Sequence, residues 1–171
     1  MRRALAVAAL LLLVGAAKKT NNDGLRIYNF NGDAMEPTIH TKERVLVDEL
    51  AYMVQRPQRG HVVAYRSPTD TAISTIKRIV GLPGETVELR KGKLFINGQE
   101  MAETWAHTDA NAAPKPSDDY GPLKLGPAEY FLLSDNRNRP YDLRGQGAVM
   151  LGYIHGRVIR ASGQGGVRDV R

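Results

Sequence analysis

The chain has 171 residues, which is enough for one domain of ordinary size but too few for two. Hydrophobic residues make up 42% and charged residues 25%, a globular composition, and the absence of cysteine excludes a disulfide scaffold, a thiol nucleophile and a cysteine metal site. The net charge of +6 lies at the ends, because residues 1–19 carry +4, residues 157–171 carry +3 and the stretch 20–156 carries −1. A DNA-binding domain needs its basic charge on the folded surface, so this distribution disfavours nucleic acid as a partner.

The first predicted element is an apolar run of fourteen residues, 4–17. As a helix it would span about 21 Å, less than the roughly 30 Å hydrocarbon core of a bilayer, but the flanking pairs Arg2–Arg3 and Lys18–Lys19 could snorkel and extend it. We therefore favour a retained membrane anchor. A cleaved secretory signal that ends at the small residues 15–17 and a buried core helix remain alternatives. Two basic residues on each side leave the orientation undetermined.

The rest of the chain is predicted to be mainly β. Short, alternating segments rich in β-branched residues, separated by Gly- and Pro-containing turns, predict strands at 44–48, 61–66, 74–80, 86–89, 94–96, 130–133 and 156–159. Only residues 42–54 have some helical potential. The polar, proline-containing stretch 101–129 predicts a long surface loop or small subdomain. The expected architecture is an irregular β-sandwich or barrel after one N-terminal hydrophobic helix.

These patterns give a domain plan. Residues 1–19 form the anchor or signal segment, 20–27 a linker, 28–160 the β domain and 161–171 a basic C-terminal tail.

Four segments stand out together, although each alone fits an ordinary turn or strand. In chain order they are residues 32–39 (GDAMEPTI), 59–65 (RGHVVAY), 77–85 (KRIVGLPGE), and 134–137 (SDNR) with 141–145 (YDLRG). The residues of these segments and their order along the chain resemble bacterial signal peptidase I, the leader peptidase family of membrane serine proteases, over roughly residues 28–160. The preceding hydrophobic segment fits the same family.

The resemblance implies a membrane-held β-rich catalytic domain on the outer face of the cell membrane, with a single N-terminal anchor here. Its partners would be membrane lipid and the signal peptides of secreted preproteins. The family removes signal peptides from exported preproteins. It cuts the chain after a small residue, with another small residue two positions earlier. It uses a Ser/Lys dyad and neither a metal nor a cofactor. The four histidines agree with this, because they lack metal-ligand spacing.

The family motifs assign roles to residues of this chain. Lys77 matches the general base, and a lysine can act as a base only when neutral, which requires burial beside apolar residues such as Ile76 and Ile79. Supporting ion pairs and hydrogen bonds are expected from Arg78, Asp135, Asn136, Asp142 and Arg144. The substrate pocket is expected to be lined by Phe30, Met35, Pro37, Ile39, Ile73 and Ile76.

The decisive departure from the family pattern is at the nucleophile, where Ala34 stands in place of serine. Alanine has no nucleophilic atom, so the chain is predicted to be inactive as written. Pro140 stands where the family usually has a serine whose hydroxyl contacts the lysine, Leu143 replaces another serine, and Ser134 replaces a glycine. Ala34 fits either a deliberate knock-out or a natural inactive relative.

Three hypotheses follow. The first is a signal-peptidase-type membrane endopeptidase that lacks its nucleophile. The second is a pseudo-protease that binds signal segments or regulates an active partner. The third, a self-cleaving repressor-type relative, is disfavoured by the apolar N-terminus and by the lack of a DNA-binding segment.

Overall fold

A computed structural model describes residues 24–66, 74–108, 118–138 and 147–171. Over these residues the protein is mainly β, which confirms the predicted fold class. The described part of the chain contains no helix long and apolar enough to cross a membrane. The expected N-terminal helix and the sequence assignments to Ile73, Pro140, Asp142 and Arg144 lie outside the described residues.

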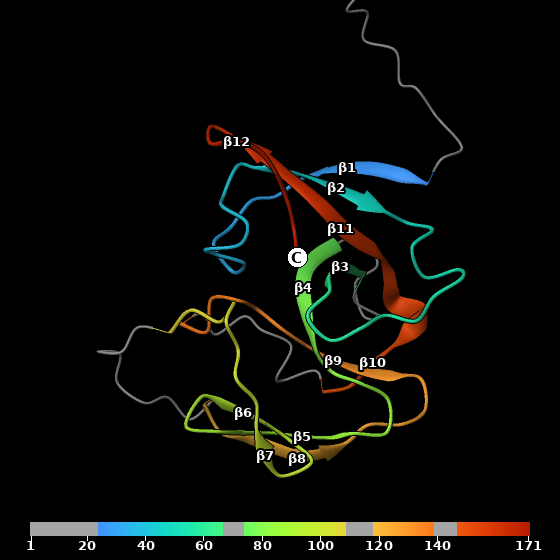
Figure 1. The fold of residues 1–171 in the computed structure, drawn as a ribbon, viewed down its shortest axis with the longest axis vertical. Helices are drawn as coiled ribbons and strands as arrows, with labels where there is room; N and C mark the ends of the chain where they lie inside the picture. Colours follow the sequence, from blue (N-terminus) through green and yellow to red (C-terminus); the bar gives the residue numbers. More distant parts are fainter. Residues whose placement is uncertain (1–23, 67–73, 109–117, 139–146) are drawn as a thin grey trace, which may run out of the picture.

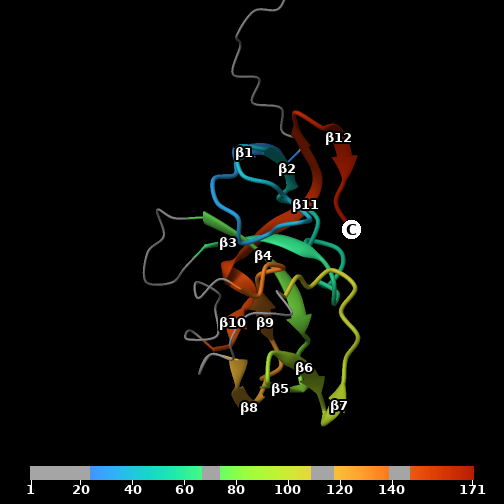
Figure 2. The same cartoon turned by 90° about the vertical axis from the view of Figure 1, so that its left-hand side faces the viewer.

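The larger of two sheets has eight antiparallel strands (Figures 1 and 2). Its strands are β1 (Leu25–Asn29), β2 (Arg44–Asp48), β3 (Val62–Arg66), β4 (Ser74–Gly81), β9 (Glu129–Leu133), β10 (Val149–Met150), β11 (Ile154–Gly163) and β12 (Gly166–Asp169). They lie in the order β1-β2-β11-β3-β4-β9-β10, and β12 pairs with β11. A short 3-10 helix, η3 (Leu151–Tyr153), leads from β10 into β11.

The smaller sheet lies at the other end of the molecule, at the bottom of Figure 1. It contains β5 (Thr86–Arg90), β6 (Lys93–Ile96), β7 (Gln99–Glu100) and β8 (Tyr120–Lys124), in the order β7-β6-β5-β8. Two tight turns at 91–92 and 97–98 place both of their residues at positive φ, as two-residue hairpins require. Both turns, Lys91-Gly92 and Asn97-Gly98, are among the glycine-containing turns that the sequence predicted between strands.

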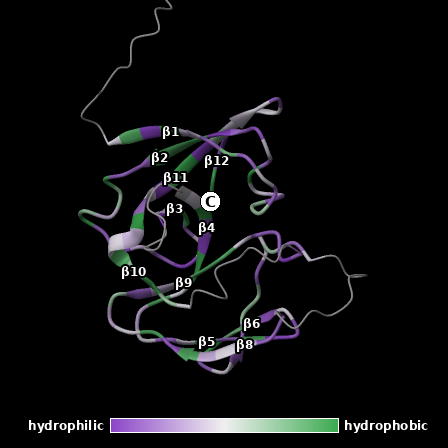
Figure 3. Ribbon diagram, turned by 180° about the vertical axis from the view of Figure 1, so that it is seen from behind, coloured by the Kyte–Doolittle hydropathy of each residue, from purple (hydrophilic) through white to green (hydrophobic). Residues whose placement is uncertain are grey.

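One of the buried hydrophobic clusters of the described residues lies where these sheets meet. Strands β4 and β9 pack against the smaller sheet through a buried cluster: Val80, Val87, Leu89, Leu94, Ile96, Leu125, Phe131 and Leu133. Gly81 marks the closest approach, since a Cβ there would come within 2.6 Å of the Val87 side chain. Along the strands hydrophobic and hydrophilic residues are mixed, which is typical of half-buried sheets (Figure 3).

The structure corrects the helical potential of residues 42–54. That segment forms strand β2 followed by turns, because burial alternates along it: Val45 and Val47 are fully buried, whereas Arg44, Leu46 and Asp48 are not. Five strands of the described part of the chain escaped the sequence analysis. Two of them, β7 and β10, have only two residues each, and the others are β1, the edge strand β8, which contains Pro122, and β12, which lies within 161–171.

Candidate active site

Lys77 lies in the middle of strand β4 with its side chain inside the protein. The residue is 4% exposed, and its neighbours Ile76 and Arg78 are 6% and 1% exposed. Its Nζ donates a hydrogen bond to Ser134 Oγ at 2.8 Å. This is the kind of burial that favours a neutral lysine amine.

Ala34 lies in the loop between β1 and β2. The side chains that follow it, Met35 and Ile39, are fully buried in the core beneath the larger sheet. The backbone N–H of Ile39 donates to the Met35 carbonyl at 2.9 Å, which closes a turn around the Glu36–Pro37 corner. The buried side chains of Met35 and Ile39 therefore fix the loop to the core, while Ala34 in the same loop remains partly exposed.

Ala34 and Lys77 line the same cavity, which has a volume of about 420 Å³. Its walls come from the end of β1 and the following loop, from β2 and β3, and from β4: Tyr28, Asn29, Phe30, Asn31, Gly32, Ala34, Val45, Ala64, Thr75, Ile76 and Lys77. Most of this lining is apolar or small. The structure thus brings together the two motifs that the sequence separates by 43 positions.

The substrate-pocket residues proposed from the sequence divide into two groups. Phe30 and Ile76 line the cavity. Met35 and Ile39 lie in the core with 0% exposure, and Pro37 is exposed on the loop, so these three do not line it. Ile73 lies outside the described residues. The sequence analysis missed Tyr28, Val45, Ala64 and Thr75, because a cavity wall formed by different strands has no continuous signal in the chain.

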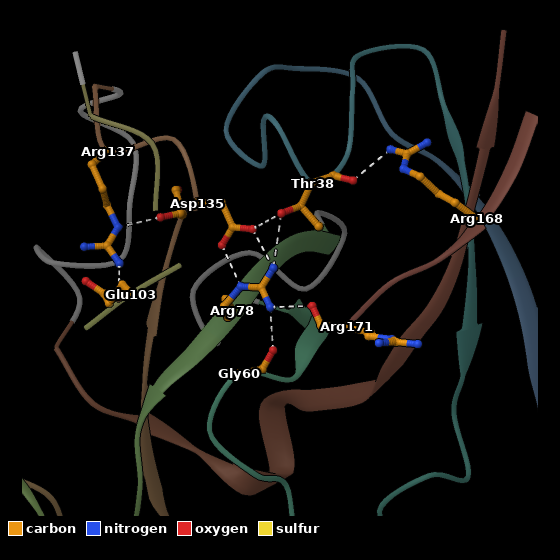
Figure 4. Close-up of polar contacts among 9 residues, drawn as sticks. Thr38, Gly60, Arg78, Glu103, Asp135, Arg137, Arg168 and Arg171 are labelled. Atoms are coloured by element: carbon orange, nitrogen blue, oxygen red, sulfur yellow. Dashed lines mark hydrogen bonds and ion pairs between the residues drawn. The ribbon is translucent and has the colours of Figure 1, made fainter. Parts of the chain in front are cut away.

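Next to Lys77, Arg78 forms a buried ion pair with Asp135 (Figure 4). Its Nε donates to Asp135 Oδ1 at 2.8 Å and its Nη2 to Oδ2 at 2.7 Å, and the two side chains are 2% and 0% exposed. Thr38 Oγ1 also donates to Asp135 Oδ2, at 2.5 Å. The two hydrogen bonds between Arg78 and Asp135 form a bidentate pair, which fixes the orientation of both groups.

The remaining donors of Arg78 are also used. Its Nη1 donates to the backbone oxygens of Gly60 at 2.6 Å and Arg171 at 2.7 Å, and its guanidinium lies 5.0 Å from the centre of the Trp105 ring. Arg78 thus connects the turn before β3 and the segment after β12 to the strand that carries Lys77 (Figure 4). It also packs on Trp105, in the segment after β7.

Asn136 connects the segment after β9 to the Ala34 loop. Its backbone N–H donates to the Ala34 carbonyl at 3.0 Å, and its side-chain amide donates to the Asp33 carbonyl at 3.1 Å. Arg137 is buried as well, donating to the Ser134 carbonyl at 2.8 Å and pairing with Glu103. Residues 134–137 therefore hold both the lysine strand and the loop of residue 34.

His61 lies close to this network but does not line the cavity. Its Nδ1 is 3.0 Å from the Tyr52 hydroxyl, and the two rings stack. Burial, assisted by nearby Arg157, lowers the pKa of His61 below its usual value, which keeps the ring neutral near pH 7. It is a packed residue immediately before β3, beside the site.

Comparison with known proteins identifies the family. The sequence profile described as "Signal peptidase, peptidase S26" matches residues 2–161. The chain belongs to this family.

Curated relatives agree with this assignment. Signal peptidase I of Bacillus amyloliquefaciens is 31% identical over 140 residues, which cover 80% of this chain and 74% of the relative. Signal peptidase I S of Bacillus subtilis is 33% identical over 141 residues, covering 80% and 75%. The probable signal peptidase I-2 of Synechocystis is 35% identical over 132 residues, which cover 74% of this chain but only 57% of that protein.

A solved structure is also similar. The signal peptidase I of Enterococcus faecalis is 31% identical, with a TM-score of 0.50 over 61% of this chain and 98% of the solved chain.

Proposed function

We propose that the cavity of this chain is a signal peptidase I site, which binds the cleavage region of exported preproteins, and that Ala34 leaves it without the nucleophile. One observation carries the proposal. The buried amine of Lys77 and residue 34 share one cavity, although they come from a strand and a loop far apart in the sequence. A nucleophile and its base must meet in this way.

With serine at position 34, the chemistry would follow from this placement. Neutral Lys77 takes the hydroxyl proton as Oγ attacks the scissile carbonyl carbon, and the carbonyl electron pair moves onto oxygen. Backbone N–H groups at the nucleophile turn stabilise that oxyanion. The Lys77 ammonium then gives its proton to the leaving amine, and an acyl-enzyme remains. Lys77 finally activates a water molecule, which releases the signal peptide and regenerates the serine.

The bound segment is proposed to lie as an extended strand against β4. Strand β4 pairs with β3 over residues 74–78, whereas its pairing with β9 begins only at Arg78. Within the described residues, the side of β4 next to Thr75, Ile76 and Lys77 therefore has no strand partner and borders the cavity. A peptide could add a strand there, with small side chains directed at the apolar walls.

We further propose that the apolar run 4–17 holds the chain in the cell membrane as a single span, with the β domain on the outer face. The support is the run itself and the exposed apolar side chains of the described residues: Leu25 and Ile27 on β1 and Val167 on β12 are 43%, 66% and 71% exposed. We expect the full chain to resist alkaline carbonate extraction, and its release would contradict the anchor.

Cleavage of a preprotein tests the proposed site. The variants are Ala34→Ser and Ala34→Ser with Lys77→Ala, assayed at alkaline pH, where a lysine base is more often neutral. We expect the first to cleave and the second to be inactive. Cleavage by the unaltered chain that persists after Lys77→Ala would refute the proposal.

The alternative function is that of a pseudo-protease, and Ala34 is the observation in its favour. It predicts that the unaltered chain binds a signal peptide while Ala34→Ser gives no cleavage. Peptide binding and cleavage measured on the same two proteins therefore separate the alternatives.

A further inference from the structure

The hydroxyl that contacts the Lys77 amine belongs to Ser134, immediately after strand β9. Its Oγ accepts a hydrogen bond from Lys77 Nζ at 2.8 Å, inside the protein. We propose that Ser134 is the positioning residue of this site, which fixes the Lys77 amine toward residue 34. The inference rests on the proposed function and adds a residue to it.

The pairing of β4 with β9 explains why Ser134 reaches the lysine. In this antiparallel pair Arg78 is opposite Leu133 and Ile79 is opposite Leu132. Lys77 precedes Arg78 and Ser134 follows Leu133, so the two residues lie side by side just beyond the last residue pair of the two strands. The pairing of the two strands therefore places the Ser134 hydroxyl beside the Lys77 amine.

Ser134 is itself a candidate nucleophile, since a serine hydroxyl touches the lysine in a chain that has alanine at position 34. Its burial argues against that role. Ser134 is 0% exposed and does not line the cavity, whereas Ala34 does. Its carbonyl is also held by Arg137 Nε at 2.8 Å. A nucleophile must come within about 3 Å of the substrate carbonyl, which this buried hydroxyl cannot do without rebuilding the turn.

A positioning role follows from the chemistry of the lysine side chain. Its four-carbon stem is flexible, so the amine needs a fixed partner to stay aligned. When one N–H of a neutral amine is donated to Ser134 Oγ, the lone pair remains available for the proton of a hydroxyl at position 34. Pro140, which stands where the family motif has a serine, offers no side-chain hydroxyl for this purpose.

The test compares Ser134→Ala with its parent in the Ala34→Ser background. The expected result is a decrease of about ten- to a hundredfold in kcat, as for the loss of one orienting hydrogen bond, with KM nearly unchanged because Ser134 lies outside the cavity. The acidic limb of the pH profile of kcat, where activity rises as the Lys77 base loses its proton, should move. Ser134→Thr keeps a hydroxyl and should recover part of kcat.

Ser162→Ala is the matched control, because that half-buried serine on β11 donates to the Arg44 carbonyl, at 3.3 Å, and does not line the cavity. It should leave kcat and the pH profile unaltered. An active Ala34→Ser enzyme whose kcat and pH profile are unaffected by Ser134→Ala would overturn the inference while leaving the proposed function intact. Cleavage by the unaltered chain that Ser134→Ala abolishes would overturn it in favour of Ser134 as nucleophile.

A second measurement does not depend on cleavage. In the full chain as it exists, the ¹⁵N resonance of the Lys77 amine should shift in Ser134→Ala and stay in place in Ser162→Ala. If Ala34→Ser proves inactive, the proposed function fails and this resonance decides the positioning role separately. An unchanged Lys77 resonance in a folded Ser134→Ala chain would overturn it.

Discussion

Arg168, on strand β12, forms two hydrogen bonds with the carboxylate of Glu43. Its Nη1 donates to Oε1 and its Nη2 to Oε2, each at 2.6 Å. The same Nη2 donates to the Thr38 carbonyl at 2.7 Å, and the Thr38 hydroxyl in turn donates to Asp135. Figure 4 shows this continuous path from β12 through the loop of residues 33–40 to the ion pair beside Lys77. The last strand of the chain thus stabilises the loop that carries residue 34.

Replacing Arg168 should make stability depend on pH in a defined way. The Arg168 guanidinium holds the pKa of Glu43 below its ordinary value of 4.5, although burial acts in the opposite direction. A carboxyl whose pKa is lowered on folding stabilises the fold above its unfolded pKa, and this contribution is lost as pH falls through the folded pKa. Arg168→Gln should therefore destabilise the protein by about 1–2 kcal/mol at pH 7, and progressively less as the pH falls to about 3.

Urea unfolding over that pH range measures the difference. Arg160→Gln is the matched control, because Arg160 on β11 pairs with Asp169 on β12, the strand that also carries Arg168, but these two side chains are 58% and 70% exposed. An exposed pair of this kind contributes little, so its replacement should have nearly the same small effect at every pH. A loss in Arg168→Gln that does not vary with pH would contradict the assigned role of Glu43.

Breaking the ion pair between Arg78 and Asp135 should be the most destabilising change of charge in the described part of the chain. Asp135→Asn leaves a guanidinium buried at 2% exposure without its countercharge. Loss of one partner from such a pair typically costs about 3–5 kcal/mol.

Glu100→Gln provides the comparison for this prediction, because Lys93 and Glu100 form an ion pair that is 64% and 52% exposed. It should alter the free energy of unfolding by less than about 1 kcal/mol. Equal effects of the two variants would show that the buried pair adds nothing beyond a surface contact.

Much of the fold was predictable because half-buried strands repeat with a period of two. Strand β2 was predicted at its observed bounds, and β3, β4, β5, β6 and β9 to within one residue at either end. Strands β1 and β12 were missed for a physical reason. Both have exposed apolar residues, such as Ile27 and Val167, so their alternation does not mark a buried face.

The site was predictable only in part. The motifs indicated Lys77, Arg78 and Asp135 because short segments carry them. The contact between Ser134 and Lys77 depends on pairing between residues 57 positions apart. The same holds for Arg168, whose partner Glu43 is 125 positions away. A sequence pattern reports local periodicity, and it carries no information on which distant strands become neighbours.

Gly81 should not tolerate a side chain. An added Cβ would lie 2.6 Å from the Val87 side chain and 2.8 Å from the Phe131 side chain, in the core between the two sheets. Gly81→Ala should therefore destabilise the protein by about 1–3 kcal/mol through overpacking, measured by chemical unfolding. Gly152→Ala is the control, because nothing lies within 4 Å of a Cβ there. Equal stability of both variants would mean that the sheets can separate freely at Gly81.

Ile76 should set the size of side chain that the cavity admits. It lines the cavity on β4 and is 6% exposed, so Ile76→Ala removes bulk from the wall of the proposed binding site. The unaltered chain should bind peptides with alanine at both small positions of the cleavage motif more tightly than peptides with valine there, since a larger group would clash.

Ile76→Ala should reduce or reverse that preference in a peptide-binding titration, because the vacated volume accepts the extra methyl groups. The matched control is Ile79→Ala, the same change on the same strand. Ile79 is 0% exposed and packs with Val63, Tyr130 and Leu132, away from the cavity lining. Both variants should lose about 2–4 kcal/mol of stability, as buried isoleucine-to-alanine changes do. Only Ile76→Ala should alter the ratio of the two affinities. An equal effect of the two variants on that ratio would show that selectivity follows overall stability, and would remove Ile76 from the binding site.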